Sequence, residues 1–233
     1  MDEIIARMEF FEHTAVKPAG SRRAAPRQKR VTALFGGGPD GNEQLTTLSG
    51  AILIVLLAVI GITILAIGQL LWLHLFVGLL LLGPVAVKIA STGYRFVRYY
   101  AGNPAYREKG PPVFVLRAIA PIVVVSTVIV FASGVLLLIA GPGGRGELLL
   151  VHKASFIIWL PFTGLHVLGH LGTVGRSLGL TGSGSRALTA SPGLPARWVV
   201  LVAGLLLGLV VAVALVPEFA SWTAHGALAQ RDH

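Results

Sequence analysis

The sequence contains no cysteine and few charged residues. Without cysteine the chain can form no disulfide, no thiolate zinc site, no iron–sulfur cluster on its own ligands and no CxxCH attachment of c-type haem. Only 12% of the 233 residues are charged, against about 25% in an ordinary soluble domain, and the mean hydropathy is +0.77. This composition excludes a disordered chain and a soluble enzyme with a normally charged surface, and it leaves histidine as the obvious metal ligand.

Four long stretches contain no Asp, Glu, Lys or Arg. They cover residues 44–87, 118–144, 154–175 and 198–217, which are 44, 27, 22 and 20 residues long. A helix crosses the hydrocarbon core in about 20 residues, so the first stretch can hold two spans and the others one each. Gly68, Gln69 and Trp72 suit a turn at the membrane surface within the first stretch. The sequence predicts an all-α integral membrane protein with five transmembrane helices, over residues 47–67, 71–94, 114–139, 149–172 and 197–216.

Lys and Arg lie in alternate loops. Seven are in the N-terminal tail, five lie between the second and third spans (Arg95, Arg98, Arg107, Lys109, Arg117), and three follow the fourth span (Arg176, Arg186, Arg197). The opposite loops hold only Arg145 and Arg231. The positive-inside rule therefore predicts a bacterial cytoplasmic membrane protein with its N-terminus in the cytoplasm and its C-terminus outside. The formal charge of +9 is therefore explained by basic residues in the cytoplasmic loops, where they are expected to contact membrane lipid. No nucleic acid is expected as a partner.

The spans divide the chain into five segments. Residues 1–46 are expected to be a basic, partly disordered cytoplasmic tail, and residues 47–175 a four-helix membrane core. Residues 176–196 are expected to be a cytoplasmic linker, residues 197–216 the fifth helix and residues 217–233 an extracytoplasmic tail.

Four of the seven histidines lie in the predicted spans, where an ionisable side chain is costly and marks a functional candidate. His74 and His152 each lie about three residues into a helix that descends from the outer face. Two imidazoles at one depth on parallel helices can approach one iron from opposite sides. His74 and His152 are therefore the predicted axial ligands of an outer, noncovalently bound haem.

A second spacing concerns the inner half of the membrane. His152 and His166 are 14 residues apart, close to four helical turns, so their side chains leave one face about 21 Å apart along the axis. The same step leads from His74 to Lys88. His166, His170 and Lys88 are therefore candidate ligands of an inner haem. His170 could instead hydrogen bond to a propionate, and Lys88 could instead extend toward the inner surface.

The 14-residue ligand step on two helices resembles the membrane cytochromes b. The small helical core resembles bacterial cytochrome b561 and the cytochrome b subunits of hydrogenases and formate dehydrogenases. The residues that carry the resemblance are His74 in LHLFVG, His152 in LLVHKASF, and His166 and His170 in GLHVLGH. The resemblance covers about residues 47–175, with the fifth helix outside it, and Lys88 departs from a pattern that has His there. It implies a four-helix bundle that binds one or two haem b groups.

Anionic haem propionates are expected to pair with basic residues at the membrane faces. Arg145 and Lys153 are the outer candidates, and Arg95, Arg117 and Arg176 the inner ones. The expected function is electron transfer between a quinone pool and a redox partner subunit, so the chain would be part of an oxidoreductase and not an enzyme by itself. Two alternatives stay open. One is a haem-free anchor, assembly factor or permease with packing histidines, and the other is a reductase whose flavin domain comes from a partner.

Overall fold

The computed structural model describes residues 37–110, 114–177 and 193–229, all of which belong to one unit, Ala33–His233. Within these ranges the chain is helical and contains no strand. Five helices are long and apolar enough to cross a membrane: α2 (Gly38–Leu65), α3 (Ile67–Tyr100), α5 (Phe114–Ala140), α6 (Gly146–Ser177) and α8 (Leu194–Ala229). A short helix, α4 (Pro104–Glu108), follows α3, and a 3-10 turn, η1 (Pro142–Gly144), joins α5 to α6. The prediction of an all-α protein with five helices able to span a membrane is confirmed for the described residues.

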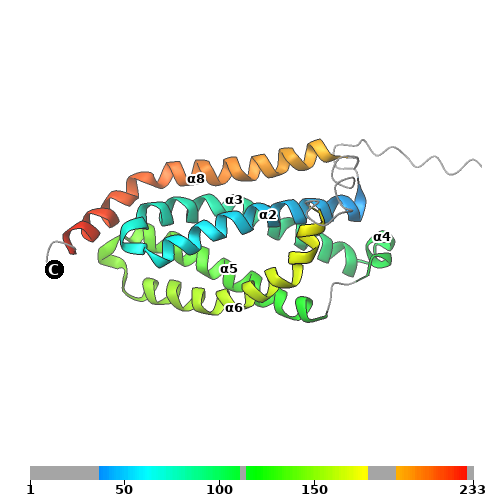
Figure 1. Cartoon of the computed structure of the whole chain (residues 1–233), viewed down its shortest axis with the longest axis horizontal. Coiled ribbons are helices and arrows are strands. Elements are labelled where there is room, and N and C mark those ends of the chain that lie inside the picture. The colour runs from blue at the N-terminus through cyan, green and yellow to red at the C-terminus, as the bar shows by residue number, and fades with distance from the viewer. Residues whose placement is uncertain (1–36, 111–113, 178–192, 230–233) are drawn as a thin grey trace, which may run out of the picture. The chain divides into compact units, whose positions relative to one another are not determined.

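The break in the first apolar stretch lies close to its predicted position. The helical dihedrals are lost at Ala66 (φ −130°, ψ 44°) and again at Leu70 (φ −108°, ψ 19°). The backbone N–H groups of Gln69 and Leu70 both donate to the carbonyl oxygen of Ala66, at 3.1 and 2.9 Å. Trp72, expected in the turn, lies inside α3. The tight connection makes α2 and α3 a hairpin, as η1 does for α5 and α6 (Figure 1).

Several helices extend beyond the predicted spans. Residues 38–46, expected in the N-terminal tail, form the first turns of α2, where Pro39 has the fixed φ of an N-terminal position and Asp40 complements the helix dipole. α3 continues through Arg95 and Arg98 to Tyr100. α8 continues past Pro217 to Ala229. Apolar length marks where a helix lies in the hydrocarbon and does not mark where its hydrogen bonding stops. Most of the predicted tail and linker, residues 1–36, 178–192 and 230–233, lies outside the described residues.

The fifth helix packs against the core along α3, and these two helices make the most extensive contact of any pair (Figure 1). A Cβ added to Gly83 of α3 would lie 1.8 Å from the carbonyl oxygen of Gly204, and one added to Gly208 would lie 2.1 Å from that of Leu80. The two backbones are therefore in direct contact, as in the close helix crossings that Gly-xxx-Gly sequences allow in membranes.

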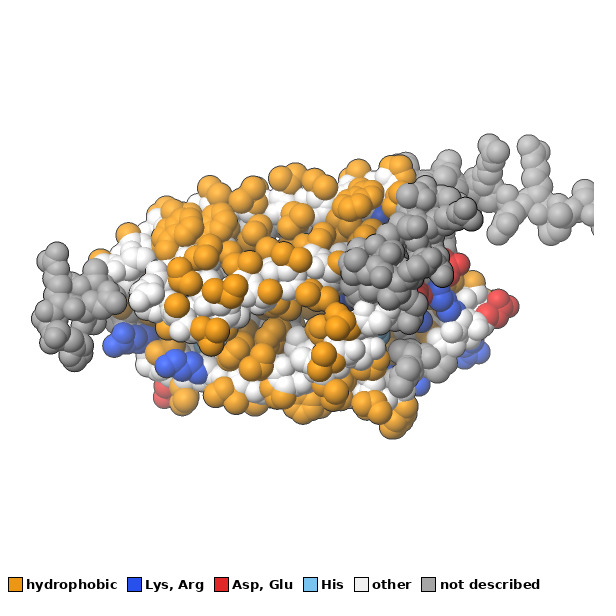
Figure 2. Space-filling model, in the orientation of Figure 1, with side chains coloured by type: hydrophobic (Ala, Val, Ile, Leu, Met, Phe, Trp, Pro, Cys, Tyr) orange, Lys and Arg blue, Asp and Glu red, His pale blue; other side chains and the backbone are white. Residues whose placement is uncertain are grey.

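The interior and exterior of the helix bundle have the polarity expected in lipid. Among the described residues, buried polar or charged side chains are as numerous as buried hydrophobic ones, and they include Ser49, Thr63, Ser91, Ser133 and Thr163. Large apolar side chains cover the outside, with Val55, Leu150 and Val199 all more than 60% exposed. Figure 2 shows hydrophobic side chains over the length of the helices and charged side chains at the two ends. This distribution fits a bundle whose exterior faces hydrocarbon and whose helices meet through small and hydroxylated side chains.

Candidate functional site

His74 is held by a hydroxyl group on the neighbouring helix of its hairpin. Its Nδ1 atom lies 2.9 Å from the Oγ1 atom of Thr63, a residue of α2 with no exposed surface. The hydroxyl proton of Thr63 is donated to the carbonyl oxygen of Ile60 at 2.7 Å. With its proton in the bond to Ile60, the Thr63 oxygen accepts from His74, which assigns the imidazole proton to Nδ1 and leaves Nε2 with its electron pair.

His152 has the same protonation for a related reason. Its Nδ1 atom lies 3.0 Å from the backbone carbonyl oxygen of Val130, on α5, and 3.2 Å from the Oγ atom of Ser133. A carbonyl oxygen can only accept, so Nδ1 again carries the proton and Nε2 is the unprotonated nitrogen. A hydrogen bond from Nδ1 to a carbonyl or hydroxyl oxygen is the arrangement that orients metal-ligating histidines.

The structure brings these two imidazoles together. His74 lies on α3 and His152 on α6, one from each hairpin, and the two side chains are close enough to interact electrostatically. A Cβ added to Gly134 would lie 3.1 Å from the Cε1 atom of His152, so the absence of a side chain at this position makes room for the ring. Both rings therefore offer an unprotonated Nε2 in the same half of the bundle.

Lys88 does not offer its amine as a free ligand. Its Nζ atom donates to the backbone carbonyl oxygen of Thr46, on α2, at 2.6 Å and lies close to Gly50. The Thr46 hydroxyl in turn bonds to Asn42 O and lies 3.0 Å from Ser91 Oγ. Lys88 thus belongs to a polar network that joins α2 to α3 near the start of α2.

His166 and His170 lie against each other on α6. Their ring centroids are 4.8 Å apart, and both side chains interact electrostatically with Lys88. The Nδ1 atom of His166 and the Oγ1 atom of Thr163 are buried, and the described residues supply neither with a hydrogen-bond partner. His166 therefore differs from His74 and His152, each of which has an acceptor for its Nδ1 atom.

The basic residues expected near propionates lie at both ends of the bundle. Arg145 and Lys153 are exposed beside the start of α6, at the end that holds His152. At the other end, Arg95 interacts electrostatically with His170, while Arg117 hydrogen bonds to the hydroxyl of Tyr100 and lies over its ring. The side chain of Arg176 lies outside the described residues.

Sequence reasoning missed a cluster around α4, at the end of the bundle that carries Arg95 and Arg117. Lys109 forms ion pairs of 2.5 Å with Asp40 and Glu43, which join the end of α4 to the start of α2. Burial acts to lower the pKa of Lys109, but the hydrogen bonds that its ammonium donates to Asp40 and Glu43 outweigh burial and raise that pKa. The buried ring of Tyr106 packs at right angles to Tyr94, and burial raises the pKa of its hydroxyl. The acidic first turn of α2 was the available sequence signal.

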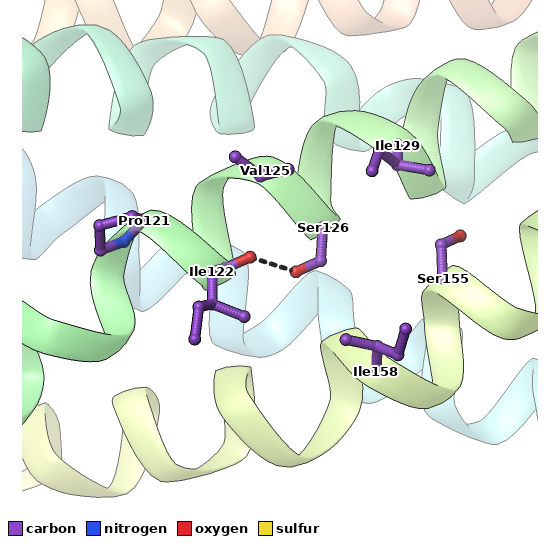
Figure 3. A pocket seen from close by; sticks show the side chains of 7 residues that line it. All are labelled: Pro121, Ile122, Val125, Ser126, Ile129, Ser155 and Ile158. Atoms are coloured by element: carbon purple, nitrogen blue, oxygen red, sulfur yellow. Dashed lines mark hydrogen bonds between the residues drawn. The ribbon is translucent and has the colours of Figure 1, made fainter.

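An apolar groove of about 370 Å³ lies between α5 and α6 (Figure 3). Its two polar side chains bond to their own helices: Ser126 donates to Ile122 O at 2.7 Å, and Ser155 donates to His152 O at 3.0 Å. The remaining lining consists of Pro121, Ile122, Val125, Ile129 and Ile158. The groove therefore presents hydrocarbon and no free polar group.

Within the described ranges, no group of three or more His, Cys, Asp or Glu residues is arranged to hold a metal ion. A site built only from protein ligands would need such a group, whereas a haem iron needs one or two side chains because the porphyrin supplies four nitrogens. Comparison of the chain with protein-family models, with curated proteins and with solved structures finds no match. The function of the chain must therefore be inferred from the geometry of the site.

Proposed function

We propose that this membrane protein binds a b-type haem between α3 and α6, with His74 and His152 as its axial ligands. The observation that carries the proposal is the common state of the two rings. Each Nδ1 lies within hydrogen-bond distance of a fixed oxygen, Thr63 Oγ1 for His74 and Val130 O for His152. This arrangement leaves Nε2 of each ring as the nitrogen that can bind iron. Two axial ligands both need Nε2 unprotonated and Nδ1–H bonded to an oxygen, so their tautomers must match. Two histidines that only pack between helices have no such requirement. These residues suit one haem in the half of the bundle that holds Arg145 and Lys153. Both basic side chains are available to pair with the haem propionates.

A haem bound in this way supplies a one-electron redox centre. The protein contributes ligand identity, exclusion of water and nearby charge, which together set the potential of such a centre. Apolar side chains surround the bundle, and the described residues offer no second redox group. We therefore propose electron transfer between a membrane quinone and a redox partner subunit as the function.

We further propose that the chain lies in a bacterial cytoplasmic membrane with its N-terminus inside. The end of the bundle formed by α4 and its neighbours carries Arg95, Arg98, Arg107, Lys109 and Arg117, whereas the η1 end carries Arg145 and Lys153. This asymmetry supports the orientation by the positive-inside rule.

Reduced-minus-oxidised visible spectra of the detergent-purified protein, with a pyridine haemochrome assay, test the proposal. We expect b-type bands at one haem per chain, and loss of that haem in both His74→Ala and His152→Ala. His170→Ala is the matched control, because it removes a histidine from the same helix as His152 and should leave the haem in place. A wild-type protein without b-type bands after expression with ample haem would favour a haem-free anchor, assembly factor or permease. Full haem retention in both ligand variants would overturn the ligand assignment.

A further inference from the structure

Two polar stripes lie in the half of the bundle remote from His74 and His152. Lys88, Ser91 and Arg95 are spaced at i, i+3 and i+7, so they share one face of α3. Thr163, His166 and His170 have the same spacing on α6. Lys88 and His166 each follow an outer histidine by 14 residues, which is about 21 Å along a helix. The proposed haem site does not use these residues.

The residues of these two stripes form one group, the inner cluster. Its basic side chains have no acidic partner among the described residues. Lys88 interacts electrostatically with His166 and His170, and Arg95 interacts with His170. The ion pairs found among the described residues join Lys109 to Asp40 and Glu43, so neither Lys88 nor Arg95 is paired with a carboxylate there. Thr46 O is a neutral partner for the Lys88 ammonium. A charged group inside a membrane-spanning segment needs a compensating charge, and the described part of the chain supplies none to this cluster.

Two hydrogen-bonding atoms of the same cluster are also unpaired. Thr163 Oγ1 and His166 Nδ1 are buried and have no partner among the described residues. Buried polar atoms are nearly always paired, so an unpaired couple one turn apart marks the position of a missing group. A ligand with negatively charged oxygens would pair these atoms and balance the positive charge.

A second haem fits this cluster poorly. An axial ligand needs a free electron pair, and the Lys88 ammonium instead donates a proton to Thr46 O at 2.6 Å. His166 also lacks the Nδ1 acceptor that orients both outer histidines. The residues present therefore favour an anion over an iron centre.

We propose that the phosphate group of an anionic membrane phospholipid binds between Lys88, Arg95 and His170. Thr163 and His166 hydrogen bond to its oxygens. All three residues keep some exposed surface, through which a headgroup can reach them. Arg98, which lies 5.9 Å from the ring centres of Tyr94 and Tyr106, continues the basic and aromatic surface at the same end. Basic pockets between membrane helices on the cytoplasmic side are known receptors for acidic lipid headgroups.

Native mass spectrometry of the full chain, delipidated in a neutral detergent and titrated with phosphatidylglycerol or phosphatidylcholine, tests the proposal. We expect clear preference for phosphatidylglycerol, and an affinity about fivefold lower for Arg95→Gln, because one basic residue near a membrane contributes about that much. His170→Gln should also weaken binding. Arg145→Gln, an exposed basic residue at the opposite end, is the matched control and should bind as the wild type does. The experiment needs no bound haem, so its outcome is independent of the proposed redox function.

Three results would overturn the proposal. The first is equal affinity for the two lipids. The second is wild-type affinity for phosphatidylglycerol in both Arg95→Gln and His170→Gln. The third comes from thermal unfolding of the same delipidated protein. Full stabilisation by inorganic phosphate, with no further stabilisation by phosphatidylglycerol, would assign the cluster to a free anion.

Discussion

The Nδ1 atom of His152 lies 3.0 Å from the backbone carbonyl oxygen of Val130, 22 residues earlier in the chain. This contact joins α6 to α5 and fixes both the tautomer and the orientation of the ring, because a carbonyl oxygen accepts and cannot donate. The bond between His74 and Thr63 has the same effect in the other hairpin. The residues that hydrogen bond to the two imidazole rings therefore determine which ring nitrogen of each candidate ligand can bind iron.

Thr63→Val should weaken haem binding without removing a ligand. Valine keeps the shape of the buried threonine but leaves the Nδ1–H of His74 without its acceptor. Loss of such a supporting bond costs about 10- to 100-fold in the affinity of a metal centre. Titration of the haem-free protein with hemin measures the change.

Thr127→Val is the matched control for this variant. Thr127 is also buried in a membrane helix, but its hydroxyl accepts a bond from Trp159 Nε1 at 2.8 Å and touches neither candidate ligand. It should bind hemin with the wild-type affinity. Equal affinities in Thr63→Val and the wild type would contradict the role assigned to Thr63.

Single cysteines can determine the orientation, because the natural chain has none to remove. Ala105 is exposed on α4, and Gly143 is exposed in η1 at the opposite end of the bundle. In intact cells a membrane-impermeant maleimide should label Gly143→Cys, while Ala105→Cys should react only after permeabilisation. The reverse pattern would place the N-terminus outside, and labelling of both sites in intact cells would contradict a transmembrane arrangement of the hairpins.

Gly208→Ala should destabilise the protein by separating α8 from α3. The new methyl group would lie 2.1 Å from the carbonyl oxygen of Leu80, a backbone atom that cannot rotate away. Overpacking of this kind costs about 1–3 kcal/mol in the free energy of unfolding. Thermal unfolding in detergent measures the loss.

Gly61→Ala provides the comparison for the Gly208 variant. Gly61 is a helical glycine of α2, and a Cβ there meets no atom within 4 Å. The substitution should leave stability unchanged or raise it slightly, because alanine favours the helix by about 0.5–1 kcal/mol over glycine. A Gly208→Ala protein as stable as Gly61→Ala would rule out the tight crossing of α3 and α8.

Lys109→Met should cost stability at neutral pH and less in strong alkali. The ion pairs with Asp40 and Glu43 raise the pKa of Lys109 in the folded state, so their contribution is complete below the ordinary lysine pKa of about 10.4. It is lost as the pH rises through the higher folded-state pKa. All three side chains are partly exposed, so the contribution should be below about 1 kcal/mol and should shrink in salt.

The difference in melting temperature between the wild type and Lys109→Met, followed from neutral to alkaline pH, measures this effect. Arg107→Gln is the control on α4, because Arg107 forms no ion pair among the described residues. A difference for Lys109→Met that stays constant through the alkaline range would show that the ion pairs are not its source.

The five spans could be predicted because membrane insertion depends on local composition. An uncharged stretch of about 20 residues provides the hydrocarbon-facing surface of one helix whatever its neighbours are. The helix ends were less predictable: α2 begins at Gly38 and α3 runs to Tyr100, since helical hydrogen bonds continue beyond the apolar segment. The sequence alone also identified His74 and His152 as candidates, because ionisable groups are rare in such stretches and their depth follows from counting residues.

The tertiary structure decided which atoms face those residues. Nothing in the sequence around Thr63 or Val130 indicates that they contact a histidine. The contacts form only because α2 packs on α3 and α5 packs on α6. Lys88 bonds to Thr46 across 42 residues, and Gly83 meets Gly204 across a still larger separation. The sequence by itself determined how many helices cross the membrane and at what depth the histidines lie, because both follow from local composition and helical rise. Tautomer, hydrogen-bond partner and helix crossing depend on contacts between distant segments, which only packing brings together.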